Sequence, residues 1–168
     1  QPARTDYHLH LRSLARELAK IIQAAYPDSK LRICVDSAPI MERSFASLSG
    51  IGFIGKNTAL IVPGWGSYLF LAEILTTAPL DIPPTDPMED GCGSCTRCLG
   101  ACPMGALEGP YQLDATRCLS YLSIENQGAL SPNMGRKMDR CFLGCDRCQE
   151  VCPFNGGTQS PVTMLPTT

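Results

Sequence analysis

The second half of this chain contains the segment Cys92-Gly93-Ser94-Cys95-Thr96-Arg97-Cys98-Leu99-Gly100-Ala101-Cys102-Pro103, which is its strongest structural signal. The four cysteines of this segment follow the spacing C-x2-C-x2-C-x3-C-P, which is that of bacterial ferredoxins. The first three thiols can surround one face of a 4Fe-4S cube, and the fourth, which precedes a proline, leaves that loop and ligates a second cluster. The stretch therefore predicts a domain that holds two iron–sulfur clusters.

A shorter copy of this pattern follows at Cys145, Cys148 and Cys152, again with a proline after the last cysteine. Two such runs ligate each other's clusters, which places the clusters close enough for electron transfer. Two clusters need eight thiols, and the two runs supply seven. Spacing alone does not choose the eighth, because Cys141 lies close to the position that symmetry would use and Cys118 lies far upstream.

Two other interpretations of the cysteines are weaker. A disulfide framework is typical of short secreted chains, whereas this chain has 168 residues, of which 44% are hydrophobic. A zinc site would use C-x2-C pairs or a mixture of Cys and His, and both histidines, His8 and His10, lie far from the cysteine runs. Because cluster thiols are kept in reducing compartments, we expect the chain to be cytoplasmic.

Net charge and hydropathy argue against two further classes of protein, stand-alone nucleic-acid-binding domains and membrane-spanning proteins. The formal net charge is −2, and each oxidised cluster with four thiolates adds about −2 more. A stand-alone nucleic-acid-binding domain would normally be basic. No run of about 18 or more apolar residues occurs, so we expect no transmembrane helix and no membrane partner. No signal peptide is visible, and we interpret the sequence, which begins with Gln1, as part of a longer chain.

The residues before the cysteines predict a mixed α/β portion. Leucines and isoleucines at helical spacing predict an amphipathic helix over residues 8–26. Alternating apolar residues predict a strand over 31–36, and a short helix is expected to begin at Pro39. Residues 58–62 and 68–75 are expected to form a hairpin around a Pro-Gly-Trp-Gly turn.

The fold class predicted from these elements is α+β. Residues 1–78 form the α/β portion, and four prolines within residues 79–90 mark a linker. Residues 91–155 form the ferredoxin-like double 4Fe-4S domain. Residues 156–168 are expected to be a loop-like tail.

The α/β portion offers few chemical signals of its own. Its glycine-rich loop, residues 50–57, matches the spacing G-x-G-x-x-G, but a sharp loop packed near the sheet is the better interpretation of a lone match. Lys56 is either an anion contact or a solvated loop lysine. Asp36 is either a proton donor or, better on pattern alone, a turn residue. Cys34 is expected to be a buried core thiol.

Six segments that occur in order give the chain a resemblance to a known family. They are Asp6-Tyr7-His8, Val35 to Arg43, Gly50 to Asn57, Cys92 to Pro103, Cys118 to Glu125 and Gly144 to Asn155. Together they resemble the epoxyqueuosine reductases over residues 6–155, which is nearly the whole chain. Those enzymes depend on cobalamin and two 4Fe-4S clusters, and they remove the epoxide oxygen of epoxyqueuosine in the tRNA anticodon loop.

The resemblance implies a role for each matching residue. One cluster would be ligated by Cys92, Cys95, Cys98 and Cys152, and the other by Cys102, Cys118, Cys145 and Cys148. Asp36 would be the proton donor beside cobalamin, provided that burial raises its pKa enough to keep it protonated. Cobalamin would also lie near Lys56, Asn57, Ser120 and Tyr121.

The resemblance further implies a nitroreductase-like cobalamin domain that begins in residues 1–78. The expected partners are tRNA carrying epoxyqueuosine and a small redox protein that donates electrons. Part of the family's cobalamin pocket and its tRNA-gripping helical-repeat tail have no counterpart in this sequence.

Two other functions share the clusters. A reductive dehalogenase would use the same cofactors on an organohalide, but the segment from Asp36 to Pro39 and the Cys118-x-Ser120-Tyr121 motif argue against it. A two-cluster electron-transfer module without catalysis is the alternative from another class. A cobalamin absorption spectrum would separate that module from both enzymes.

Overall fold

The computed structural model describes residues 6–83, 85–130, 138, 141 and 143–156. The α+β class predicted from the sequence is confirmed, and the likeness of the first portion to nitroreductases stays a prediction. The helices and strands of the first portion are α1 (Tyr7–Ala25), β1 (Leu31–Cys34), α2 (Glu42–Leu48), β2 (Phe53–Ile54), β3 (Leu60–Ile61) and β4 (Glu73–Thr76). Those of the cysteine region are α3 (Arg97–Ala101), β5 (Leu107–Gly109), β6 (Gln112–Leu113), η1 (Ala115–Arg117), α4 (Leu119–Ile124), α6 (Arg147–Glu150) and η2 (Pro153–Asn155).

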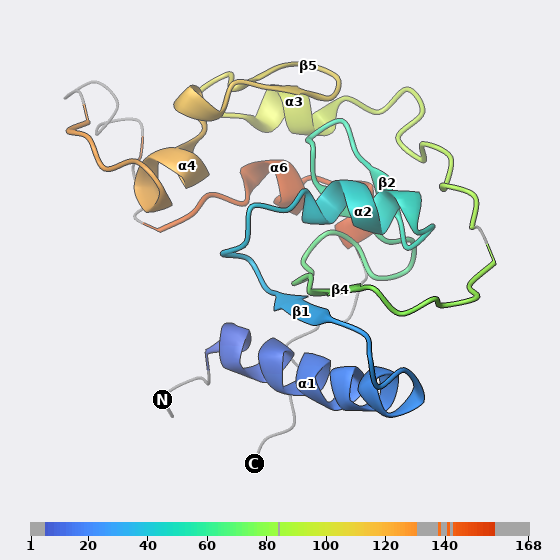
Figure 1. The fold of residues 1–168 in the computed structure, drawn as a ribbon. Coiled ribbons are helices and arrows are strands. Elements are labelled where there is room, and N and C mark those ends of the chain that lie inside the picture. Colours follow the sequence, from blue (N-terminus) through green and yellow to red (C-terminus); the bar gives the residue numbers. More distant parts are fainter. Residues whose placement is uncertain (1–5, 84, 131–137, 139–140, 142, 157–168) are drawn as a thin grey trace.

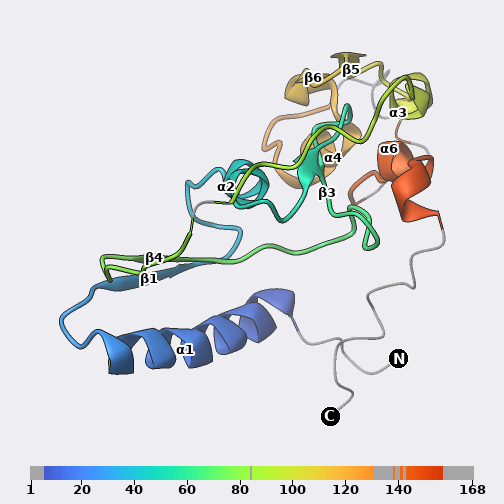
Figure 2. The same cartoon turned by 90° about the vertical axis from the view of Figure 1, so that its right-hand side faces the viewer.

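Helix α1 confirms the predicted amphipathic helix to within one residue at each end. It begins after Asp6, whose carboxylate accepts a hydrogen bond from the His8 backbone N–H at 3.0 Å, and it ends before Tyr26 and Pro27. Figure 2 shows α1 lying along one side of the β1–β4 pair. Ala15 is buried against this pair, so the helix rests on the sheet through a small side chain.

The predicted hairpin of residues 58–62 with 68–75 is wrong. Strand β4 pairs antiparallel with β1, so that Leu31 lies opposite Thr76, whereas β3 pairs with β2. The turn does close, through Val62 and Gly66, but the next residue leaves it: the Ser67 backbone N–H donates to Asn155 Oδ1 at 2.7 Å instead of pairing with β3. Alternating apolar residues identify a strand but not its partner, which here comes from a more distant segment.

The glycine-rich segment is a tight β2–β3 hairpin. A Cβ on Gly52 would collide with the carbonyl oxygen of Ile61, so only glycine allows the two strands to approach this closely. The hairpin buries Phe53, Leu60 and Ile61. The expectation of a sharp loop packed near a sheet therefore holds, with the difference that the segment supplies a strand itself.

The cysteine region is built from short helices. Helices α3 and α6 pack against each other (Figure 1), and each ends at a Cys-Pro pair, Cys102-Pro103 or Cys152-Pro153. A residue before proline is confined to extended conformations, and Cys102 accordingly has φ −70° and ψ 111°. Asp114 caps η1, since its side chain accepts a hydrogen bond from the Thr116 backbone N–H, and α4 follows directly after Cys118.

Contacts join the α/β portion to the cysteine region. The rings of Phe53 and Phe154 meet edge to face with centroids 5.3 Å apart. Ser67 Oγ donates to Gln149 Oε1 at 2.8 Å, and Asn155 Nδ2 donates to Ser67 Oγ at 2.9 Å. The proline-rich segment after β4 runs along one side of the molecule to α3 (Figure 1). The β2–β3 hairpin is therefore held against the cysteines.

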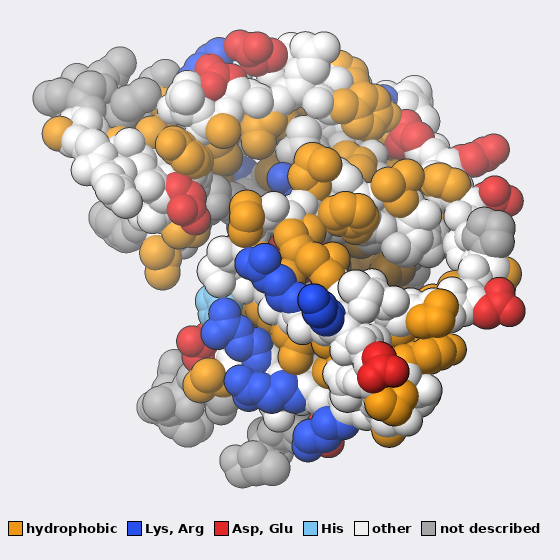
Figure 3. All heavy atoms as spheres, viewed as in Figure 1, with side chains coloured by type: hydrophobic (Ala, Val, Ile, Leu, Met, Phe, Trp, Pro, Cys, Tyr) orange, Lys and Arg blue, Asp and Glu red, His pale blue; other side chains and the backbone are white. Residues whose placement is uncertain are grey.

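The surface is uneven in charge and shape. Figure 3 shows Lys and Arg side chains gathered over the face formed by α1, β1 and α2, which carry Arg12, Arg16, Lys20, Arg32 and Arg43. The same view shows a hollow between the part that contains α4 and the N-terminal end of α1. In the part of the chain that the structure describes, none of the helices has both the length and the apolar character needed to cross a membrane.

Candidate iron–sulfur site

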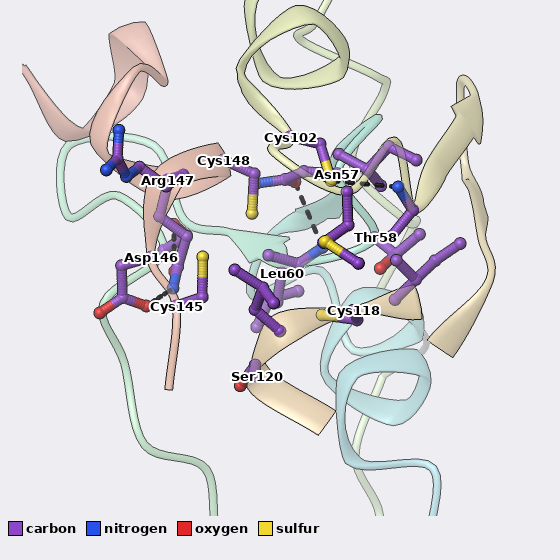
Figure 4. Close-up of a pocket in the computed structure, with 18 of the residues that line it drawn as sticks. Asn57, Thr58, Leu60, Cys102, Cys118, Ser120, Cys145, Asp146, Arg147 and Cys148 are labelled. Carbon is purple, nitrogen blue, oxygen red and sulfur yellow. Dashed lines mark hydrogen bonds between the residues drawn. The ribbon is translucent and has the colours of Figure 1, made fainter. Parts of the chain in front are cut away.

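Four thiols line a cavity of about 300 Å³ between α3, α4, α6 and the β2–β3 hairpin. They belong to Cys102, Cys118, Cys145 and Cys148, and Figure 4 shows them around one space. The remaining wall is more apolar than polar: Leu60, Leu69, Leu71, Ala106, Leu107, Leu113 and Leu119 line it, together with polar residues that include Asn57, Ser120 and Asp146. Such a lining excludes water from a cluster, and its dryness is one of the factors that set a cluster's reduction potential.

A second cavity, of about 260 Å³, is lined by the other four thiols. These are the thiols of Cys92, Cys95, Cys98 and Cys152, and Phe154 and Ile61 close the apolar side. Within the described part of the chain, no three His, Cys, Asp or Glu side chains are arranged to hold a single metal ion. The thiols instead stand apart around cavities, a donor set that fits a four-iron cube with one thiolate on each iron.

The structure thus brings together the same two groups of four thiols that the family resemblance implies. Each cysteine run supplies one thiol to the cavity of the other run, and this happens where α3 packs on α6. Cys98 and Cys102 lie at opposite ends of the short helix α3, so they can face different cavities. Cys152 follows α6 and faces the first run, while Cys102 faces the second. That these eight thiols ligate two clusters stays a prediction, and it now rests on position as well as spacing.

The two candidates for the eighth ligand differ in position. Cys118, directly before α4, lines the first cavity. Cys141 does not line it but lies beside Cys145, with which it forms a hydrogen bond. The geometry therefore favours Cys118. Cys34 is 1% exposed in β1 and lines neither cavity, which confirms it as a core thiol.

Burial affects the protonation of four of these thiols. It raises the pKa of Cys92, Cys98 and Cys145, and it raises the pKa of Cys148 to about 11, with the neighbouring Cys118 adding to the effect. Since a cluster binds thiolates, cluster assembly must release protons from this site. Two backbone groups already donate to sulfur: Lys56 N–H to Cys92 Sγ at 3.4 Å and Ala106 N–H to Cys102 Sγ at 3.2 Å.

Lys56 supports the first cysteine loop. Its side chain is buried, and its ammonium donates to the carbonyl oxygen of Gly93 and, at 3.1 Å, to that of Cys95. The interpretation of Lys56 as a solvated loop lysine is therefore wrong. A role for Lys56 near cobalamin stays a prediction, but its ammonium is already engaged by the loop that carries three thiols.

Asp36 is a turn residue, as its sequence pattern favours, and its role as a proton donor stays a prediction. Strand β1 ends at Cys34, two residues earlier than predicted, and Asp36 occupies a turn with φ +56°, a conformation that aspartate tolerates better than most residues. Its side chain is 62% exposed, so the burial that a proton donor needs is not present in this chain. The Asp36 backbone N–H donates to Glu42 Oε1 at 2.9 Å, which fixes the turn against α2.

Two residues at the start of α1 hold the Asp36 carboxylate. The Tyr7 hydroxyl donates to Asp36 Oδ2 at 3.0 Å, and His8 Nε2 lies 3.2 Å from the same oxygen. On its other side His8 Nδ1 lies 2.7 Å from Asp6 Oδ1. No local pattern in the sequence marks Tyr7 and His8 as partners of Asp36, because only the packing of α1 on β1 brings them to it.

The electrostatics of this group follow from its contacts. The hydrogen bond to Asp6, followed by that to Asp36, raises the pKa of His8 above its ordinary value. Partial burial and then the bond to Asp36 raise the pKa of Tyr7 to about 12, so its hydroxyl keeps its proton and acts as a donor. The Tyr7 ring also stacks on Phe70, with centroids 3.9 Å apart.

The other residues expected near cobalamin divide between two places. Asn57 is buried and lines both thiol cavities. Ser120 lines the first cavity, and Tyr121, which follows it on α4, is 39% exposed. Helix α4 and the N-terminal end of α1 border the hollow seen in Figure 3. The start of α1, where Tyr7 and His8 hold the Asp36 carboxylate, therefore borders that hollow on one side and α4 borders it on the other.

Comparison with known proteins agrees with this geometry. The family described as a 4Fe-4S double cluster binding domain matches residues 91–155. The epoxyqueuosine reductase of Xanthomonas campestris pv. campestris is 45% identical over 150 residues, which cover 89% of this chain and 42% of that protein.

Two solved structures are similar in fold as well as in sequence. Selenomethionine-labelled epoxyqueuosine reductase has a TM-score of 0.85 and 42% identity, covering 92% of this chain and 40% of that chain. Epoxyqueuosine reductase with an epoxyqueuosine-modified tRNA-Tyr stem loop has a TM-score of 0.82 and 40% identity, with the same coverage. This chain thus spans about two fifths of the length of these relatives. By sequence and by fold, it belongs to the epoxyqueuosine reductase family.

Proposed function

We propose that the protein to which this chain belongs reduces epoxyqueuosine to queuosine in the tRNA anticodon loop, using cobalamin and electrons relayed by two 4Fe-4S clusters. The observation that carries the proposal is the pair of four-thiol cavities in a chain that is 45% identical to an epoxyqueuosine reductase. The proposal includes a cytoplasmic location, where the reducing poise keeps thiols free.

In this proposal the eight thiols that line the cavities hold the clusters. Bound clusters would supply single electrons at potentials set by their surroundings. Lys56 keeps the first cysteine loop in place, and the packing of α3 on α6 keeps the two sites adjacent. A small redox protein would deliver the electrons. The arrangement suits a relay because each run contributes a thiol to the other run's cavity.

Asp36 would supply the proton. Opening an epoxide leaves a negatively charged oxygen, which a nearby carboxylic acid can protonate. Tyr7 and His8 hold the Asp36 carboxylate in position at the start of α1, which borders the hollow. Cobalamin and substrate covering this border would desolvate the carboxyl and raise its pKa, which is what a general acid needs.

The residues around the hollow fit a large polar cofactor. Asp36 and Tyr121 are exposed, and Ser120, which precedes Tyr121 on α4, lines the first cavity. We propose that cobalamin lies in this hollow, between Asp36 and the cluster held by Cys102, Cys118, Cys145 and Cys148. Cobalamin, when bound, would supply the reduced cobalt that attacks the epoxide, and the protein would supply position and proton.

The proposed tRNA partner needs a positively charged surface. A solved relative was crystallised with an epoxyqueuosine-modified tRNA stem loop. In this chain the basic side chains over α1, β1 and α2 lie next to the hollow (Figure 3). We propose that they contact backbone phosphates, which sets orientation rather than sequence preference.

The native protein that carries this sequence provides the test. Purified without oxygen, it should contain close to eight irons per chain, show a cobalamin spectrum after reconstitution, and convert epoxyqueuosine in tRNA to queuosine in a single turnover. Full iron content without cobalamin binding or turnover would contradict the proposal in favour of an electron-transfer module. Turnover of an organohalide in place of epoxyqueuosine would contradict the substrate.

A further inference from the structure

Asn57 is a buried amide with one end unpaired. Its side chain is 6% exposed, and it lines both the cavity of Cys102, Cys118, Cys145 and Cys148 and that of the other four thiols. Among the described residues, no hydrogen-bond partner is present for Asn57 Nδ2. An unpaired buried amide destabilises a protein, so its presence suggests a partner that binds later, such as a cofactor.

The orientation of the amide is determined by its neighbour. Asn57 Oδ1 accepts a hydrogen bond from the Ala59 backbone N–H at 3.3 Å. A flipped amide would turn two N–H donors towards that N–H, so the oxygen must face Ala59 and the NH₂ group must face away from it. Figure 4 shows the Asn57 side chain entering the cavity that Cys102 and Cys148 line.

The backbone around Asn57 holds this orientation. Thr58 has φ +64°, which is strained for a β-branched residue and persists only where the surrounding structure enforces it. Two hydrogen bonds do so: Thr58 N–H to Gly55 O at 2.8 Å and Gly55 N–H to Ala59 O at 2.9 Å. The turn between β2 and β3 thus presents the Asn57 amide in one direction, towards the thiols.

Oxygen-bearing side chains also line the first cavity, among them Ser67, Ser120 and Asp146, but within the described residues none of them accepts a hydrogen bond from Asn57 Nδ2. The same cavity offers four cysteine sulfurs, and its wall is more apolar than polar. A loaded site would hold thiolate and sulfide sulfurs, both of which accept N–H hydrogen bonds. Ala106 N–H already donates in this way to Cys102 Sγ, so the cavity has a precedent for such a bond.

We infer that Asn57 Nδ2 donates a hydrogen bond to a sulfur of the cluster held by Cys102, Cys118, Cys145 and Cys148, and that this bond raises the cluster's reduction potential. The inference rests on the proposed function only in requiring that this cluster is bound. Reduction adds one negative charge to the cluster, and a donor to sulfur stabilises the more negative state. Removing the donor therefore shifts the potential to a more negative value.

Spectroscopy on the unaltered protein tests the bond directly. The native protein is prepared with asparagine labelled with ¹⁵N in the side-chain amide, and the clusters are reduced by one electron. Pulsed electron paramagnetic resonance should show coupling between the unpaired spin and a ¹⁵N nucleus. Absence of coupling in a protein with full iron content overturns the inference, whereas lack of iron in the protein contradicts the proposed function instead.

Substitution then identifies the residue and measures its effect. Asn57→Leu fills a similar volume without a donor, and Asn57→Asp keeps the acceptor for Ala59 but replaces the donor with a charge. In a redox titration followed by the same resonance, both should lower the potential of one cluster, Asn57→Asp by more, and both should abolish the ¹⁵N coupling. Asn126→Leu, which alters a partly exposed residue after α4 outside both cavities, should change neither measurement.

The titration also shows which cluster Asn57 serves. To tell the two clusters apart, the redox titration is repeated with the Cys118→Ala variant, which lacks one thiol of the first cavity and none of the second. The lower potential of Asn57→Leu should belong to the cluster that Cys118→Ala perturbs. An unchanged potential in Asn57→Leu, or a shift confined to the other cluster, overturns the inference. The ¹⁵N coupling of the unaltered protein decides the matter if neither variant folds.

Discussion

The hydroxyl of Tyr7 donates a hydrogen bond to Asp36 Oδ2 at 3.0 Å, across 29 positions of the sequence. Tyr7 opens α1 and Asp36 follows β1, so this bond joins the helix to the turn that carries the proposed acid. His8 approaches the same oxygen at 3.2 Å. The position of the Asp36 carboxylate is therefore set by a helix that the sequence presents as an ordinary amphipathic segment.

Replacing Asp36 tests the proton donor. Asp36→Asn keeps the shape, the turn chemistry and an acceptor for Tyr7, but an amide cannot deliver a proton. Single-turnover reduction of epoxyqueuosine in tRNA should fall by roughly two to four powers of ten, the span of general acid catalysis. Iron and cobalamin content should not change. Asp28→Asn, at the far end of α1, is the matched control, and a near-normal rate in Asp36→Asn would remove Asp36 from the mechanism.

The pKa of His8 should depend on Asp6 more than on Asp36. The folded pKa is raised above the ordinary value of 6.5, chiefly by the hydrogen bond to Asp6. Asp6→Asn should therefore lower it more than Asp36→Asn does, as followed by NMR of the imidazole protons. Asp28→Asn should leave the pKa of His8 unchanged.

The same shift gives stability a pH dependence with a definite sign. Protonated His8 is favoured in the folded state, so its contribution is fully present below its ordinary pKa of 6.5 and is lost as pH rises through the raised folded value. Denaturant midpoints measured across this range should fall less with rising pH in Asp6→Asn than in the unaltered protein. An equal pH dependence in both proteins would show that the Asp6–His8 pair does not stabilise the fold.

The eighth cluster ligand can be identified by iron content. Cys118 lines the first cavity, whereas Cys141 lies beside Cys145 outside it. Cys118→Ala should therefore lose or degrade one cluster, and Cys141→Ala should keep both, as measured by iron per chain and by resonance spectra. Loss of a cluster in Cys141→Ala together with retention in Cys118→Ala would reverse the assignment.

Removing the Lys56 ammonium should weaken the first cysteine loop. Its two bonds to carbonyl oxygens are charge-assisted and largely buried. The loss of a charged donor of this kind costs about 1.5–3 kcal/mol. Lys56→Met should lower the free energy of unfolding by about that amount and reduce occupancy of the cluster at Cys92, Cys95 and Cys98. Lys20→Met, which removes an exposed ion pair with Glu17, should cost about 0.5 kcal/mol or less.

The chain by itself should bind tRNA weakly. Its net charge is −2, and its basic side chains over α1, β1 and α2 are few. Binding measured at increasing salt should show low affinity at physiological ionic strength and a shallow slope, since each phosphate contact contributes about one unit to that slope. A tight complex between residues 1–168 and tRNA would contradict this expectation and assign more of the binding to this face.

Local pattern was sufficient for several features of the protein. The spacing of the two cysteine runs indicated the double-cluster domain that residues 91–155 match. Helical periodicity placed α1 to within one residue, and the alternating pattern placed β1, although that strand ends at Cys34. These features depend on neighbours within a few positions, so ligand spacing and side-chain periodicity carry them.

The other features depend on contacts between segments that are distant in the sequence. Which strands pair, which side chains are buried and where they point all follow from which segments meet in the fold. Strand β4 pairs with β1, whereas Ser67, between β3 and β4, donates to Asn155 in the cysteine region. Spacing left Cys118 and Cys141 equal, and only the position of α4 brings Cys118 to the cavity. Asn57 was one residue of a glycine-rich loop in the sequence, and the β2–β3 hairpin turns its amide towards sulfur. Asp36 owes its partners to the docking of α1 on β1, since a carboxylate's surroundings are a property of packing rather than of its neighbours in the chain.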